Sequence, residues 1–514
     1  MTLVKNVCRF GLIAAIGIFS LTACSGAADK RDAKAAASSL INENKSIVAF
    51  GHVSVKELLD KLDYKQLPKV NAILSAEIPS WEKGLDLKTP VYYALQAPFA
   101  KDGTPDVFYG FLNVKDKAKL LDKFTSMGYT MEKTGEISYF SEDDVTIGVR
   151  NDLAIVISKK DDYDGKAMIE KAFKETEGDE SDGKAEDILD EKGDIVAGIS
   201  IERLYTTSNT SLSKLPEAKK TELEKMIKDG YVQTVATFKK GEARIESKNL
   251  FSDELKDRLF FKEDANATVL KKLGNGTAWM GISANIDMRK LESFMTDFAP
   301  GANEKLNEKL PGEATMALAM LGENPLGKMF SGQLGFVAVG NPSVEGMLPQ
   351  FNFFVGLGSK GDFITNMIGE YAGMAMMQKQ GDAYIIEGMA IAPRKDGLYG
   401  YTTGNGAGGL KIPSFAKGFG TKTFSMFMNL GSIDVKSLEL EPQQRVLEIM
   451  ESLVINVDRD GGELVLVSKD RSRNILKQIG LFYVEMGEEK MNELQDGALS
   501  DAEIDAMLDE AAAK

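Results

Sequence analysis

The most regular feature of the hydrophobic pattern is a six-residue motif that occurs four times along the chain. Each copy has an apolar residue, a Ser or Asp, a second apolar residue, a charged residue, any residue and a Leu. The copies begin at residues 53, 199, 286 and 433, so the first two are 146 residues apart and the last two 147. Each copy follows a short apolar run typical of a strand, and its polar side chain can cap a helix that follows. The predicted helix caps are Ser54, Ser200, Asp287 and Asp434.

Other segments repeat at matching places between the motifs. Residues 231–249 and 453–468 each predict two strands joined by a glycine turn, and residues 107–158 and 351–403 share a loose order of strand, helix and three strands. We therefore predict an α+β fold made of two homologous halves, a first repeat over residues 45–255 and a second over 265–480. Each half is expected to be a mainly antiparallel sheet with helices packed on one face.

The N-terminal residues resemble a bacterial lipoprotein signal. Two basic residues precede an apolar stretch from Phe10 to Leu21 that is too short to span a bilayer, and small residues then lead to Cys24. This resemblance implies that residues 1–23 are a signal peptide and that Cys24 becomes the N-terminus and carries acyl chains such as palmitate. Residues 24–44, rich in Ala, Ser, Lys and Asp, are interpreted as a tether or a short helix.

The residues after Cys24 favour the outer membrane. Ser25, rather than Asp, follows Cys24, which by analogy with enterobacterial sorting favours transport to that membrane. No acidic cluster follows at once, which favours a protein that faces the periplasm and leaves surface exposure open. Cys8 is lost with the signal, so the mature chain would keep one lipid-blocked cysteine and form no internal disulfide.

Composition then narrows the chemistry. The chain is 43% apolar and 27% charged, an ordinary globular balance, and its 62 basic and 77 acidic residues give a net charge of −15. Nucleic acid would be repelled, so we expect no such partner, and the lipid anchor rather than charge would hold the chain to a membrane. His52 is the only histidine, so a His-rich zinc site cannot form, and we expect His52 to be hydrogen-bonded in the fold or exposed.

The strongest candidate for a cofactor site is the G-x-G-x-x-G sequence at residues 356–361, which follows a predicted strand and precedes a helix. The matching segment 111–116 has the same arrangement without glycine, and bulky Phe363 and Ile364 follow the third glycine. We therefore interpret the sequence as a turn and predict no cofactor, no metal and no catalytic residue. Dinucleotide binding, and an envelope hydrolase that uses acidic residues, stay as alternatives.

Together, the lipoprotein signal, the length and the repeated halves resemble uncharacterised lipoproteins of Bacteroidota known only as a domain of unknown function. The resemblance brings no catalytic residue with it. We expect an outer-membrane lipoprotein, anchored through Cys24, that is a non-enzymatic binding or scaffolding component of the cell envelope with an outer-membrane protein as a candidate partner. Residues 481–514 predict an acidic C-terminal helix or tail, and binding of a partner by this segment is left open.

Overall fold

The computed structural model divides the chain into two compact units. Unit 1 comprises residues 1–199, 235–242 and 470–514, and unit 2 comprises residues 200–234 and 243–469. The described residues are 32–99, 104–142, 144–159, 163–176, 183–207, 215–262, 267–298, 320–340, 350–374, 377–386, 388–402, 409–433 and 445–496. The predicted signal peptide, with Cys24, lies outside these residues.

Unit 1 is built on an antiparallel sheet, as the sequence predicted for its class. The hydrogen-bonded order is β4–β5–β6–β7–β3–β2–β1–β8. The strands are β1 (Ile47–Val53), β2 (Val91–Phe99), β3 (Pro105–Asn113), β4 (Met131–Thr134), β5 (Ile137–Glu142), β6 (Val145–Arg150), β7 (Leu153–Lys159) and β8 (Ile195–Ser200).

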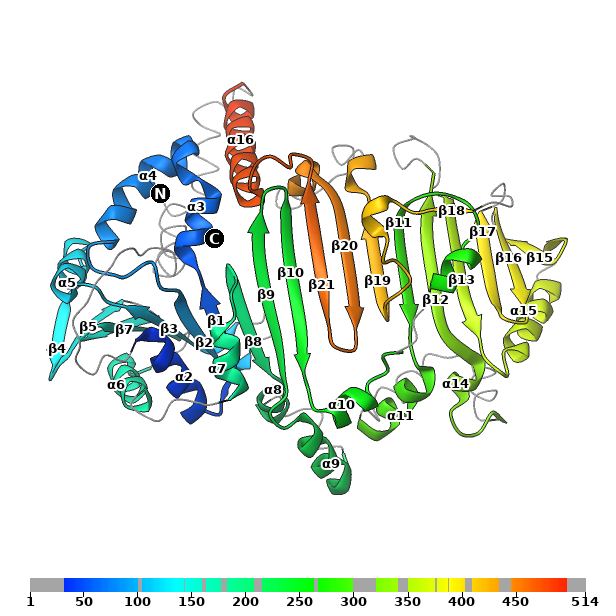
Figure 1. Cartoon of the computed structure of the whole chain (residues 1–514), viewed down its shortest axis with the longest axis horizontal. Helices are drawn as coiled ribbons and strands as arrows, with labels where there is room; N and C mark the ends of the chain where they lie inside the picture. The colour runs from blue at the N-terminus through cyan, green and yellow to red at the C-terminus, as the bar shows by residue number, and fades with distance from the viewer. Residues whose placement is uncertain are drawn as a thin grey trace, which may run out of the picture. The chain divides into compact units, whose positions relative to one another are not determined.

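Helices cover both faces of the unit 1 sheet, so the prediction that they pack on one face is wrong for this unit (Figure 1). On one face, a Cβ at Gly148 would lie 2.3 Å from Ile169 of α6 (Gly165–Glu175), and α2 (Ala33–Glu43) and α7 (Lys184–Asp190) lie beside it. On the other face, α3 (Val55–Leu62), α4 (Pro68–Trp81) and α5 (Lys117–Ser126) contribute to one buried cluster with β5, β6 and β7. Successive residues of these strands are apolar, so both faces of the sheet carry apolar side chains and each face needs a covering layer.

Helix α2 lies inside the segment predicted as a tether, residues 24–44. Asp32 caps it by accepting a hydrogen bond from the Ala35 amide at 2.9 Å. Leu40 and Ile41 are fully buried, and the helix packs against β2 and β3. The tether interpretation is therefore wrong for this part of the segment, because the apolar face of α2 belongs to the core of unit 1. The alternative of a short helix describes it correctly.

The predicted helix caps have mixed outcomes. Asp287 and Ser200 do cap helices, since each accepts a hydrogen bond from the amide three residues later, at 3.1 and 3.3 Å. The prediction for Ser54 is wrong, because its Oγ donates to the carbonyl of Gly193 at 2.9 Å and so ties the start of α3 to the chain before β8. Asp434 lies outside the described residues.

Unit 2 contains a longer antiparallel sheet with the order β14–β15–β16–β17–β13–β12–β11–β19–β20–β21. The strands are β10 (Glu242–Leu250), β11 (Gly276–Asn285), β12 (Phe330–Val339), β13 (Gln350–Leu357), β14 (Gln378–Gln380), β15 (Ala383–Ile386), β16 (Met389–Arg394), β17 (Gly397–Thr402), β18 (Leu410–Lys411), β19 (Phe424–Met428), β20 (Met450–Asp458) and β21 (Gly461–Ser468). The helical segments are α8 (Ile201–Thr207), α9 (Glu217–Ile227), α10 (Asp253–Arg258), η3 (Ala267–Lys272), α11 (Met288–Phe298), α14 (Pro325–Met329), α15 (Asp362–Met374), η4 (Ser414–Ala416), η5 (Leu430–Ser432) and η7 (Arg445–Ile449).

The two sheets have the same strand order. When β1 to β8 are matched in sequence with β11 to β17 and β19, every pairing of one sheet has its counterpart in the other. The predicted hairpin at 453–468 is confirmed by β20 and β21, which pair antiparallel. In the other predicted hairpin, β9 (Tyr231–Lys239) and β10 flank Gly241, whose φ of 67° favours glycine.

The compact units do not follow the boundaries 45–255 and 265–480. Residues 200–234 and 243–255 belong to unit 2, because β10 pairs with β21 and the helices α8 and α9 share a buried cluster with Phe298 of α11. Residues 470–480 belong to unit 1. Helix α16 (Ile475–Asp496) starts there, and the Nζ of Lys477 lies 2.8 Å from the carboxylate of Asp63. The helix predicted within 481–514 is thus present as far as Asp496 and begins earlier than predicted.

Candidate functional site

The central strands of unit 2 carry a continuous apolar surface on one face of the sheet. Successive residues of a strand point to opposite faces, and the strand register aligns those of one face in three rows. The middle row runs through Phe336, Ile282, Met426, Ile455 and Leu464, each paired with the next. We name the whole surface the open apolar face, which consists of Met280, Ile282, Ala284, Leu334, Phe336, Ala338, Phe424, Met426, Met428, Leu453, Ile455, Val457, Leu464 and Leu466.

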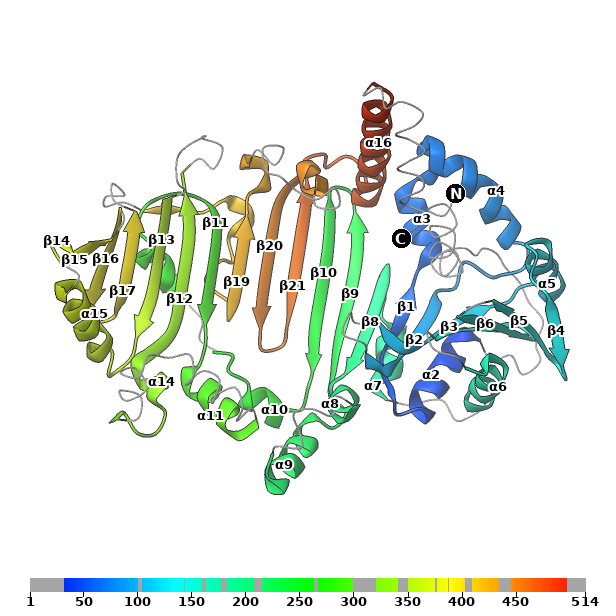
Figure 2. The same cartoon turned by 180° about the vertical axis from the view of Figure 1, so that it is seen from behind.

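The opposite face is covered at β11, β12 and β19, whereas Val465 and Val467 of β21 are only partly buried there. Val337, Phe354 and Phe427 are fully buried there, in a cluster that includes residues of η3 and η4. In Figure 2, seen from behind, no helix of the described residues is drawn over β12, β11, β19, β20 or β21. Helix α15 packs further along the sheet, against Leu398 of β17. Most side chains of the open apolar face are half-buried, its two alanines are buried, and Leu334 is 41% exposed.

Both faces of β11 and β19 carry apolar side chains, and the covered face also holds two buried serines. In an antiparallel sheet with one covered face, apolar side chains ordinarily point to the core and polar ones to water. Here Ser283 and Ser425 lie opposite each other on the covered face, are 0% and 1% exposed, and neither Oγ has a hydrogen-bond partner among the described residues. Their neighbours Ile282 and Met426 point to the open apolar face. Because an unpaired buried hydroxyl costs about 1–3 kcal/mol, core stability does not explain this arrangement.

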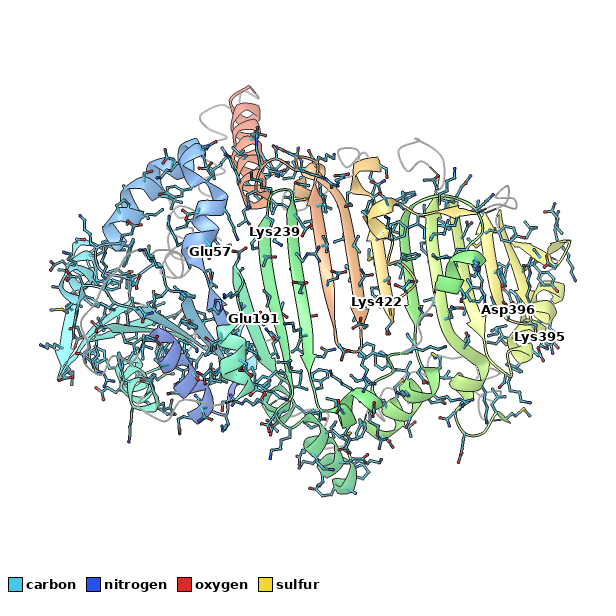
Figure 3. The ribbon with its side chains drawn as sticks, in the orientation of Figure 1. Glu57, Glu191, Lys239, Lys395, Asp396 and Lys422 are labelled. Carbon is cyan, nitrogen blue, oxygen red and sulfur yellow. The ribbon has the colours of Figure 1, made fainter. Side chains whose placement is uncertain are left out.

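A polar cleft of about 440 Å³ lies where β19 begins and β20 ends, directly beyond the last row of the open apolar face. Asp458 follows Val457 of the face, and Lys422 lies two residues before Phe424 (Lys422 is labelled in Figure 3). The cleft is lined by Asp253, Lys256, Lys262, Thr421, Lys422, Thr423, Asp458, Arg459 and Asp460. Four of these residues are basic and three are acidic, so the lining is slightly positive in a chain whose net charge is −15.

Ion pairs organise the cleft. The Nζ of Lys256 lies 2.7 Å from a carboxylate oxygen of Asp460, and this hydrogen bond lowers the pKa of Asp460. Lys422 pairs with Asp458 in the same way, which raises the pKa of Lys422. Lys262 has no ion-pair partner within the described part of the chain. An anionic or zwitterionic group would find both donors and acceptors here.

The glycine sequence at residues 356–361 forms the turn between β13 and α15, as predicted. The Gly358 amide donates to the carbonyl of Met329 and the Lys360 amide to the carbonyl of Lys328, both at 2.8 Å. A Cβ on Gly358 would lie 2.4 Å from the Lys328 carbonyl oxygen. The glycine therefore permits the close approach of α14, and two amides that a pyrophosphate would need already bind the chain itself.

His52 occupies a hydrogen-bonded position in the fold, which confirms one of the two expectations for it. It lies in β1 between β2 and β8, is 4% exposed, and its Nε2 lies 3.0 Å from the carbonyl oxygen of Glu191, a residue labelled in Figure 3. Cys24, the predicted lipidation site, lies outside the described residues.

Acidic residues form no recognisable catalytic pair in the described parts of the chain. Hydrogen bonds from the side chains of Lys119, Lys256 and Ser472 lower the pKa of Asp116, Asp460 and Asp470 respectively. A general acid needs the opposite shift, so these three carboxyl groups are not suited to that role. Nor does any group of three His, Cys, Asp or Glu side chains suited to a metal ion occur among the residues that the structure describes.

Sequence reasoning missed the open apolar face, although a signal for it is present. Parts of β11 and β19 alternate large apolar residues with small ones, as in Met426 beside Ser425 and Ile282 beside Ser283. Such alternation predicts a strand with one polar and one apolar face. Only the structure shows that the serines face the covering segments, so that the large apolar side chains lie on the uncovered side.

Comparisons with known proteins add little to this description. No protein-family model matches the chain, and no curated protein matches it. Among solved structures, crystal form III of TP0453 is 14% identical, with a TM-score of 0.26, and the match covers 42% of this chain and 80% of that one. Crystal form IV of TP0453 is also 14% identical, with a TM-score of 0.25, and the match covers 41% of this chain and 79% of that one. Similarity this low supports no conclusion about fold or function. In the described part of the chain, no helix combines the length and apolarity required to cross a bilayer.

Proposed function

We propose that this protein is a lipoprotein of the bacterial outer membrane that faces the periplasm and binds partners, without catalysis, through the open apolar face. The observation that carries the binding role is the open apolar face itself, a continuous apolar surface on five strands over which no described helix lies (Figure 2), with Leu334 41% exposed. An exposed apolar surface of several hundred Å² ordinarily marks a binding site. The lipoprotein signal ending at Cys24 supports the cellular location.

Metabolic labelling tests the anchor. Cells that express the full chain are fed a clickable palmitate analogue, and label is compared between the wild type, Cys24→Ser and the matched control Cys8→Ser. We expect the Cys24→Ser chain to lose the label and to leave the outer-membrane fraction, whereas Cys8→Ser stays labelled. Label that survives in the Cys24→Ser chain would overturn the proposed anchor.

A photocrosslinking amino acid tests the binding surface. Placed at Ile282 in the middle row, it should yield crosslinked products in the native envelope, and placed at Tyr371 of α15, which is 62% exposed, it should not. Equal products from both positions would remove the open apolar face as the binding surface.

We also infer that the two halves of the chain arose by duplication and that the chain belongs with the Bacteroidota lipoproteins that its sequence resembles. The matching order of strand pairings in the two sheets supports the duplication, because eight strands can be ordered in many ways. The four sequence motifs support it independently, with spacings of 146 and 147 residues.

A further inference from the structure

We propose that the open apolar face binds the acyl chains of a single diacyl phospholipid, whose polar head group lies in the cleft lined by Lys262 and Lys422. This inference deepens the proposed binding role and rests on the open apolar face being its surface. It assigns the chemical class of the ligand from the composition, the size and the charge of the site.

The composition favours hydrocarbon over protein. The open apolar face contains no side chain that donates or accepts a hydrogen bond, and the backbone groups of its central strands are paired within the sheet. A protein interface usually has about one hydrogen bond per 100–200 Å². A peptide, a polysaccharide or a nucleotide would leave its own polar groups unpaired on this surface. Acyl chains have no such groups.

The size of the face also favours a lipid. Five strands about 4.8 Å apart, and three alternate residues along each, cover an area of about 24 by 20 Å, or about 500 Å². The three rows continue onto β13 through Val355, Phe353 and Phe351, so the apolar surface extends beyond these five strands. An acyl chain spans half of the hydrocarbon core of a bilayer, about 15 Å, and fits along the strands.

The charge of the cleft fixes the orientation of the lipid. The cleft lies next to the last row, where β19 begins and β20 ends, so the boundary between apolar and polar surface coincides with the end of these strands. The cleft has one more basic than acidic lining residue, and Lys262 is available to a phosphate oxygen. A phospholipid that places its phosphate here would run its acyl chains away from the cleft, over the open apolar face.

Transfer of a pyrene-labelled phospholipid tests the proposal. The full chain carrying Cys24→Ser, which cannot be acylated, is mixed with vesicles of phosphatidylethanolamine that contain pyrene-labelled phosphatidylethanolamine. Loss of pyrene excimer emission and the lipid that co-elutes with the chain on gel filtration report binding. We expect one phospholipid per chain. No transfer to this chain would overturn the proposal, and because Cys24 is absent the result does not depend on the proposed anchor.

Charged substitutions locate the lipid. Met426→Glu in the middle row should weaken binding by about tenfold or more, because the acyl chains would have to cover a carboxylate. Leu334→Glu, at a position already 41% exposed, gives the same test in a chain that folds readily, and Met374→Glu, at a position 76% exposed on α15, is the matched control. Binding that is equal in all three variants would refute the site.

Three further results would contradict the proposal, and the first two would assign the face to another occupant. If the chain sediments as a dimer and Met426→Glu makes it a monomer, a second copy covers the face. Leu334→Cys can be made in a chain that also carries Cys8→Ser and Cys24→Ser. If a maleimide does not label this chain in the absence of lipid, the chain covers the face itself. If phospholipid is transferred to the Cys24→Ser chain both with and without Met426→Glu, and crosslinks from Ile282 capture only proteins, the lipid binds elsewhere. Each of these results overturns the lipid proposal, and the last leaves the proposed binding role in place.

Discussion

Lowering the pH from about 7 to about 5.5 should destabilise unit 1 through His52, the only histidine of the chain. Its Nε2 faces the carbonyl oxygen of Glu191, which can only accept, so this nitrogen carries the proton of the neutral ring. Its Nδ1 is buried and has no hydrogen-bond partner among the described residues. Burial lowers the pKa of His52 below its usual 6.5, against smaller opposing effects of the Glu191 carbonyl and the charge of Asp190.

The sign and the size of the effect follow from proton binding. In the unfolded chain a histidine titrates near pH 6.5, whereas folded His52 stays neutral to a lower pH. Between these two values the unfolded state binds one more proton, so the free energy of unfolding falls as the pH falls, by at most about 1.4 kcal/mol per pH unit. The stabilisation is complete above the unfolded pKa and is lost as the pH falls toward the folded pKa.

Urea unfolding at several pH values measures this effect. In a Trp279→Phe background, Trp81 of unit 1 is the only tryptophan, so its fluorescence reports unfolding of that unit. In His52→Gln, the amide NH₂ can still donate to the carbonyl of Glu191 but cannot titrate. We expect the decrease in stability between pH 7 and 5.5 in the parent and its loss in His52→Gln. The same decrease in both chains would refute the assignment to His52.

Two further predictions concern the cores. Asp194 is 1% exposed, pairs with Lys61 and accepts a hydrogen bond from the Phe238 amide at 2.6 Å, so Asp194→Asn should cost unit 1 about 3 kcal/mol in urea unfolding. Asp190→Asn, whose side chain is 61% exposed, should cost less than about 1 kcal/mol, and equal losses would contradict this reasoning. Phe427→Ala in the covered face of unit 2 should cost about 3–5 kcal/mol, measured by near-ultraviolet circular dichroism during urea unfolding, and a loss below about 1 kcal/mol would contradict the burial.

Sequence patterns predicted the local elements better than their surroundings. Apolar alternation identified the strands that became β9, β20 and β21, and two of the predicted caps are present because capping depends on residues within one turn of the helix. The tether interpretation was wrong for α2 because Ala and Ser carry little hydrophobic signal, while Leu40 and Ile41, which anchor the helix, are only two residues. Ser54 was mistaken for a cap because its partner, the Gly193 carbonyl, is distant in sequence.

Strand alternation defines two faces but does not determine which one is covered, and this explains why the open apolar face was not predicted. The side chains of Met426 and Ser425 alternate in the same way whichever face is buried. The covering depends on η3 and η4, which are short and have little periodicity of their own. The sequence could therefore predict the strands of this site but not which of their faces is uncovered.

The matching strand orders allow the faces of the two sheets to be compared. Helix α5 follows β3 and α15 follows β13, so the faces on which these helices pack correspond. In unit 1, α4 and α5 cover that face at β5, β6 and β7, and Trp81 and Phe124 contact each other within the buried cluster at 5.4 Å between ring centroids. In unit 2 the corresponding face is the open apolar face, over whose five strands no described helix lies (Figure 2). On β2 and β8, the counterparts of β12 and β19, the same face of unit 1 also carries apolar side chains that are not fully buried, and Ile199 of β8 is 38% exposed. In both units the helix that follows the third strand packs at the other end of the sheet, α5 over β5 to β7 and α15 against β16 and β17. An apolar face that these helices cover only in part is therefore a feature that the two sheets share.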